Sequence, residues 1–146
     1  MTTLAEILSL PGKRDAVIAD CCALLDAELG AKTGLSGVVL RAGYGALKGI
    51  RPGAIRAAVD TFLDEWVAKL EPFWAAAQER GVDPAEHLDR ERAAVAEALL
   101  SVTDGRAEKA KKGLVRSTYA KLRPSAKTHV EQAIDGLAQV LVRHAR

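Results

Sequence analysis

Residues 52–70 read PGAIRAAVDTFLDEWVAKL and carry the clearest helix pattern in this chain of 146 residues. Their large apolar side chains recur every three or four positions, at Ile55, Val59, Phe62, Leu63, Trp66, Val67 and Leu70. That period places them on one face of an α-helix. Pro52 suits the first turn, where its missing N–H costs no hydrogen bond. The stretch therefore predicts an amphipathic helix that packs against other helices.

Similar signals occur on both sides of this stretch. They predict helices over about 3–9, 11–29, 33–49, 84–102, from the end of the basic stretch to 122, and from 124 nearly to the end. Thr3 and Glu6 have the spacing of a capping box, and Asp83 can cap the helix that Pro84 opens. Pro72 is expected to start or kink a segment through Arg80, and Pro124 to break a helix. Since no strand-like alternation is present, the sequence predicts an all-α helical bundle.

An internal repeat organises this bundle. The pattern Arg41, Tyr44, Leu47, Lys48 recurs as Arg116, Tyr119, Leu122, Arg123, and an Arg-Pro pair follows in each half. Shorter matches, such as 5–8 with 85–88, accompany it. A repeated unit of about 75 residues is longer than the common solenoid repeats. We expect one domain, 1–146, built from two duplicated helical units of about 3–80 and 83–145, related by a pseudo-twofold axis.

Composition excludes several classes of protein. With 49% hydrophobic and 27% charged residues, the chain is typical of a globular domain. No apolar run is long enough to cross a membrane, and the first residues lack the basic segment of a secretory signal. The two cysteines, Cys21 and Cys22, are adjacent and cannot form a normal disulfide. We read them as small buried hydrophobes, with a redox or metal role as the alternative, and expect a cytoplasmic protein.

Signs of enzyme chemistry are missing from the sequence. The three histidines, His87, His129 and His144, are far apart, and none has metal-ligand spacing with another. The phosphate-binding and nucleophile-elbow glycine motifs are absent. We therefore expect no catalytic residue, no metal and no cofactor.

Charge is distributed unevenly along the chain. Residues 1–104 have a net charge of −5, whereas residues 105–129 have eight basic side chains and one acid, a net charge of +7. This basic stretch, residues 106–127, predicts a surface that meets nucleic acid, an acidic protein partner, or the chain's own acidic half. Candidate anion-binding residues are Arg41, Tyr44, Lys48, Arg51, Lys111, Lys112, Arg116, Tyr119 and Arg123.

The repeated Arg-Tyr-basic pattern has two interpretations. On a helix, the two cations lie three and four residues from the tyrosine and share its face, so together they could hold a phosphate or carboxylate. Alternatively, Arg41 pairs with Asp26 and Arg116 with Asp104, while each tyrosine packs its ring. The second interpretation accounts for the two aspartates, which also recur in the repeat.

Four aromatic side chains lie close together in the sequence, at Phe62, Trp66, Phe73 and Trp74. They could line a pocket for an apolar ligand. The alternative is a hydrophobic core where the two repeats meet.

Several segments resemble an uncharacterised family of bacterial domains of unknown function, found in actinobacteria and other GC-rich bacteria. The resemblance lies in the opening Thr3-Leu4-x-Glu6-Ile7-Leu8, in 32–36, in Tyr44 with Arg51-Pro52, in 70–74 and in 98–104. It implies a bacterial protein but no activity, cofactor or partner.

These observations together predict a non-enzymatic helical binding or interaction protein. Two alternatives stay open: a nucleic-acid-associated protein that uses the basic stretch, and a carrier of a small apolar ligand. Whether the chain forms a homodimer is also left open.

Overall fold

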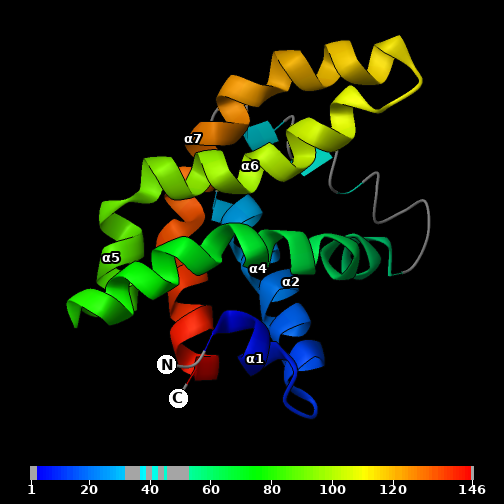
Figure 1. Ribbon diagram of the computed structural model, residues 1–146. Coiled ribbons are helices and arrows are strands. Elements are labelled where there is room, and N and C mark those ends of the chain that lie inside the picture. Colours follow the sequence, from blue (N-terminus) through cyan, green and yellow to red (C-terminus); the bar gives the residue numbers. More distant parts are fainter. Residues whose placement is uncertain (1–2, 32–36, 39–40, 43–44, 46–52, 146) are drawn as a thin grey trace.

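The computed structural model describes residues 3–31, 37–38, 41–42, 45 and 53–145. Its helices are α1 (Leu4–Leu8), α2 (Lys13–Ala31), α4 (Ala54–Arg80), α5 (Pro84–Arg90), α6 (Arg92–Glu108) and α7 (Gly113–Ala145), shown in Figure 1. Within the described ranges no strand occurs, so the predicted all-α fold is confirmed. The helix predicted over 33–49 lies mostly outside these ranges.

Local signals fix several of the helix ends. Thr3 and Glu6 form the predicted capping box at the start of α1. The side chain of Asp83 accepts a hydrogen bond from the backbone of Ala85 and caps α5. Gly81 ends α4 in a left-handed conformation, with φ of 67°, which a side chain would strain. These ends follow from residues close in sequence.

Two predicted boundaries were wrong, and of the two alternatives for Pro72 the start of a new helix was wrong. Pro72 lies inside the continuous helix α4, and Pro124 lies inside α7 rather than ending a helix. A proline inside a helix costs about 3 kcal/mol or more, which packing on both sides can offset. Figure 1 shows that α7 bends instead: it crosses the top of the view and then turns down through the molecule. The helix predicted over 84–102 is divided at Glu91 into α5 and α6.

The helices form two layers that cross. In one layer α2 and the second half of α7 run antiparallel, because His144 contacts Asp20 while Gly136 lies against Leu24. In the other layer α4 and α6 lie side by side, joined by an ion pair of 3.3 Å between Arg106 and Glu65. The short helices α1 and α5 close the ends of this arrangement (Figure 1).

One cluster of buried side chains joins the layers. Its members are Leu4, Ile7, Val17, Ile18, Val59, Leu63, Val67, Leu70, Trp74, Leu88, Val95, Ile134, Ala138 and Leu141. Arg14 fastens α2 to α4 at the edge of the cluster, with distances of 2.9 Å to Asp60 and 2.7 Å to Asp64. The core thus draws on every described helix.

The predicted duplication stays a prediction. A short helix followed by a long one occurs twice, as α1 and α2 and again as α5 and α6. The first-half counterpart of the start of α7, which includes Tyr44 and Lys48, lies outside the described residues.

Candidate functional site

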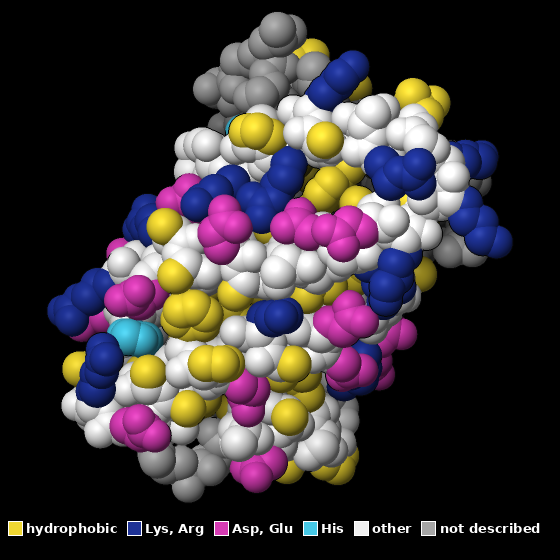
Figure 2. Space-filling view, turned by 45° about the horizontal axis from the view of Figure 1, so that its top comes forward, with side chains coloured by type: hydrophobic (Ala, Val, Ile, Leu, Met, Phe, Trp, Pro, Cys, Tyr) yellow, Lys and Arg dark blue, Asp and Glu magenta, His cyan; other side chains and the backbone are white. Residues whose placement is uncertain are grey.

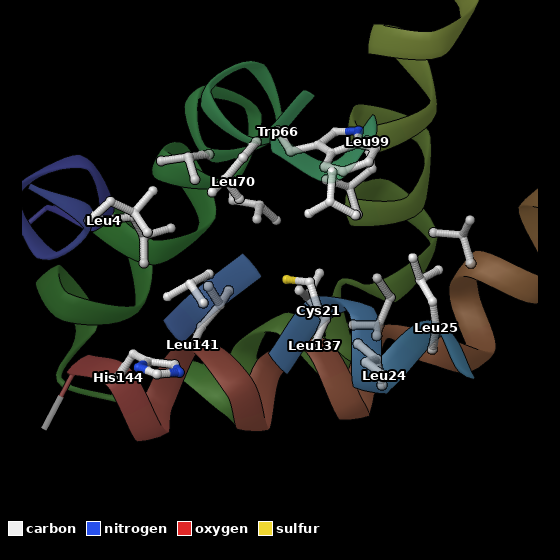
Figure 3. A pocket seen from close by; sticks show the side chains of 18 of the residues that line it. Leu4, Cys21, Leu24, Leu25, Trp66, Leu70, Leu99, Leu137, Leu141 and His144 are labelled. Carbon is white, nitrogen blue, oxygen red and sulfur yellow. The ribbon is translucent and has the colours of Figure 1, made fainter. Parts of the chain in front are cut away.

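A cavity of about 330 Å³ lies between the two layers. Figure 3 shows Trp66, Leu70 and Leu99 on one side of it and residues of α2 and α7 on the other. The labelled lining residues are Leu4, Cys21, Leu24, Leu25, Trp66, Leu70, Leu99, Leu137, Leu141 and His144. Of all the lining side chains, only those of Trp66, Thr103 and His144 carry nitrogen or oxygen. The cavity is therefore an apolar chamber whose polar groups are the indole N–H of Trp66 on α4, the hydroxyl of Thr103 on α6 and the imidazole of His144 at the end of α7.

This cavity is partly open to the surface and is larger than the voids of a closely packed core. Protein interiors pack as densely as organic crystals, with few voids larger than a water molecule. Atoms that line an empty space lose their dispersion contacts on that side. Water gains little in such a space, because it needs two to four polar partners. The arrangement is suited to an apolar occupant.

The close approach of α2 and α7 forms one wall of the cavity. A Cβ atom placed on Gly136 of α7 would lie 2.5 Å from Cδ1 of Leu24, a lining residue of α2. Only glycine at this position lets the two helices pack so closely without moving Leu24. A larger residue at Gly136 would require the end of the Leu24 side chain to move.

Cys21 is part of the α2 wall, but its thiol is poorly suited to act as a nucleophile. Burial raises its pKa to about 11, so it is a neutral thiol at neutral pH. Neither cysteine forms a disulfide. Cys21 thus presents a small apolar surface to the cavity, and both cysteines are partly buried rather than buried as predicted.

A cluster of polar side chains lies at the His144 end of the cavity. Nε2 of His144 lies 2.5 Å from an oxygen of Asp20, and its Nδ1 lies 3.5 Å from Nζ of Lys13. Arg143 adds an ion pair of 3.2 Å to the same aspartate. The hydrogen bond from His144, more than the charge of Arg143, holds the pKa of Asp20 below its usual value.

A second polar network lies at Thr103. Its hydroxyl is 2.7 Å from that of Tyr119, which donates a hydrogen bond of 2.6 Å to Asp104. Arg123 donates two hydrogen bonds of 3.0 Å to the carboxylate of Asp104 and also binds Glu97 at 2.9 Å. The planar guanidinium suits this paired geometry.

The same contacts shift the ionisation of the network. The bond from Arg123 lowers the pKa of Asp104, and it lowers that of Glu97 to about 2. Lys127 contributes to the second effect through an ion pair of 3.0 Å with Glu97. Burial, followed by the bond to Asp104, raises the pKa of Tyr119. All these groups keep their ordinary charges at neutral pH.

The predicted anion-binding residues occupy several different places. Tyr119 and Arg123 lie together, but the anion that they contact is Asp104 of the same chain. The predicted pairing of Arg116 with Asp104 is wrong, because Arg116 donates to the backbone carbonyl of Ala110. Arg123 binds Asp104 instead.

The remaining members of that set are spread further. Lys111 and Lys112 are exposed between α6 and α7. Arg41 reaches the carbonyl oxygen of Leu29 at 3.5 Å. The other three, Tyr44, Lys48 and Arg51, lie outside the described residues.

The four aromatic side chains have divided roles. Trp66 lines the cavity, and its ring lies 5.3 Å from that of Phe62. Arg106 lies over the other ring of this pair, 4.9 Å from its centroid. Trp74 is buried in the core, where no described residue accepts a hydrogen bond from its Nε1, and Phe73 packs against the core.

The surface mixes charges of both signs. Figure 2 shows Lys and Arg side chains interspersed with Asp and Glu on the face that it displays. In the basic stretch, Arg106, Arg123 and Lys127 form ion pairs with Glu65, Glu97 and Asp104 of the acidic half. Lys109, Lys111, Lys112 and Lys121 form none with any described residue. The basic stretch is therefore only partly neutralised by the chain itself.

Of the four aromatic residues proposed for an apolar pocket, only Trp66 lines this cavity, and sequence reasoning missed its other lining residues and the cluster at its end. A periodic signal did exist for one member, because Leu137, Leu141 and His144 follow the same helical spacing. Among the described residues, no group of His, Cys, Asp and Glu is arranged to hold a metal ion. No described helix has the length and apolarity needed to cross a membrane.

The family to which the chain belongs offers no activity to compare with this site. No curated protein and no solved structure matched the chain. A family model did match, over residues 4–145, nearly the full length. The chain therefore belongs to the Family of unknown function (DUF6918).

Proposed function

We propose that this protein binds a small apolar molecule in the cavity between its two layers and carries it without chemical change. The observation that supports this most directly is the cavity of about 330 Å³ with an almost wholly hydrocarbon wall. Engineered cavities of roughly 150 Å³ already bind benzene, and ligand pockets usually measure about 300–1,000 Å³. The proposal follows one of the alternatives that the sequence left open.

The chemistry of the wall favours carriage over catalysis. Cys21 is a neutral thiol, and the hydroxyl of Thr103 is bonded to Tyr119. The imidazole of His144 contacts Asp20 and Lys13 through its two nitrogens. The wall therefore offers a ligand shape and apolar contact. The same proposal places the protein in the bacterial cytoplasm, where free cysteines such as these stay reduced.

A neutral fluorescent probe tests this function. N-phenyl-1-naphthylamine should bind with a stoichiometry of one and quench Trp66, because that side chain lines the cavity. Leu99→Phe adds volume at the cavity wall and should weaken binding at least tenfold. Leu122→Phe is the matched control, since Leu122 lies exposed on α7. Absence of saturable binding, or equal binding by both variants, would reject a ligand in this cavity.

A second function rests on the basic stretch. Lys109, Lys111, Lys112 and Lys121 are exposed and have no ion-pair partner among the described residues. Clustered lysines of this kind bind nucleic-acid phosphates without sequence preference. Fluorescence anisotropy with a DNA duplex and an RNA, at low and moderate salt, tests the proposal. Replacing Lys111 and Lys112 by alanine should flatten the salt dependence by about one unit each. No binding at low salt would reject nucleic-acid binding and favour an acidic protein partner for this surface.

A further inference from the structure

We propose that the ligand is a single-chain carboxylic acid, whose hydrocarbon chain lies in the cavity and whose carboxylate binds Lys13 at the His144 end. This inference rests on the proposed function and gives the chemical class of the ligand. It follows from the shape of the cavity and from the unequal chemistry of the two polar groups beside it.

The shape favours an elongated molecule. On α7 alone the lining extends from Val130 to His144. At about 1.5 Å per residue, this stretch of helix measures about 21 Å. Figure 3 shows lining side chains distributed along this direction, from His144 at one end to Leu25 at the other. An alkyl chain fits a long, narrow space lined by leucine and valine better than a compact ring system does.

The Thr103 network is unsuited to an anionic head. The hydroxyl of Tyr119 already donates to Asp104, and Arg123 is bound to Asp104 and Glu97. The hydroxyl of Thr103 is within hydrogen-bond distance of both Tyr119 and the carbonyl of Leu100. A carboxylate placed here would meet the negative charge of Asp104 and no unused donor of this network.

The His144 end has the opposite character. Lys13 and Arg143 bring two positive charges, against the single negative charge of Asp20. The ammonium group of Lys13 has three protons and contacts one described acceptor, Nδ1 of His144 at 3.5 Å. Lys13 does not itself line the cavity, but it contacts His144, which does. A carboxylate at this end gains a charge-assisted hydrogen bond from a half-buried cation.

Displacement of N-phenyl-1-naphthylamine by decanoate and by 1-decanol tests this assignment. The two ligands share a chain length and differ in the charge of the head group. Wild-type protein should bind decanoate at least tenfold more tightly than decanol. Lys13→Met should abolish that preference, and Lys13→Arg should retain it because the charge is kept. Lys69→Met is the matched control, since Lys69 is exposed on α4 and distant in sequence from this cluster.

The outcomes separate this inference from the proposed function. Equal displacement by the acid and the alcohol would overturn the carboxylate assignment and leave an apolar ligand in place. A preference that survives Lys13→Met would also overturn it, because another group would then hold the head. If neither ligand displaces a bound probe, the single-chain assignment fails; if the probe itself fails to bind, the apolar-ligand function fails as well.

Discussion

Filling the cavity provides the most direct test of its presence. Ala133 lies on the α7 wall of the cavity, and Ala133→Leu would add three carbon atoms there. Burial of each carbon stabilises a fold by about 0.8 kcal/mol, so three give about 2.4 kcal/mol. Fixing the leucine side chain costs about 0.5–1 kcal/mol of conformational entropy. The free energy of unfolding should therefore rise by about 1.5 kcal/mol.

The same substitution on the surface gives the control. Ala120 is exposed on the same helix, so Ala120→Leu should change the free energy of unfolding by less than about 0.5 kcal/mol. Both values come from urea unfolding followed by circular dichroism, with the denaturant slope required to stay constant. The filled variant should also bind N-phenyl-1-naphthylamine more weakly than the control does.

Two results would refute this reasoning. Destabilisation of 1 kcal/mol or more by Ala133→Leu would mean that the wall has no room for the added carbons. Stabilisation with unchanged probe affinity would place the probe outside the cavity. The expected combination, higher stability with lower affinity, is hard to obtain from a surface effect.

Three further predictions concern packing, pH and the core. Gly136→Ala should give a protein less stable than Gly105→Ala in urea unfolding, by up to about 1 kcal/mol, because the new Cβ forces the end of Leu24 to move whereas Gly105 has open space. Equal stabilities would contradict the close approach. The pKa of Glu97 is lowered from 4.5 to about 2, so stability should fall as pH drops from about 4.5 towards 2, where the unfolded chain takes up a proton first. Glu97→Gln should reduce that loss in acid-unfolding curves, and an unchanged curve would count against the ion pairs. Trp74→Phe should change stability by less than about 1 kcal/mol, because loss of ring area is offset by removal of a buried N–H without a described partner; calorimetry showing a loss above 3 kcal/mol would reveal a hidden partner.

Features decided within a few residues could be predicted from the sequence. The periodic apolar positions of α4 and the caps at Thr3 and Asp83 act locally, and each was predicted. Pro124 was misjudged because its cost is local while the compensation comes from helices distant in sequence. Helix propensity gives way to tertiary packing at such positions.

The site was harder to predict than the fold. Arg116 and Arg123 flank Tyr119 at almost equal spacing, so only the path of α6 decides which of them reaches Asp104. The cavity could not be predicted because, in the sequence, a leucine that lines a cavity cannot be distinguished from a leucine that packs in the core. Lys13 and His144 lie at opposite ends of the chain, and no local pattern relates them.

The bend in α7 makes one helix serve two parts of the molecule. Its first half pairs with α6 and carries the exposed Lys121, while its second half supplies Ile134, Leu137 and Leu141 to the cavity. If the two halves of α7 move as one body, a tilt of the outer half also moves the wall of the cavity. If a partner on the outer half and an occupant of the cavity favour different tilts, each changes the affinity for the other by the same factor. Loading of the cavity and engagement of the surface would then form a single linked equilibrium.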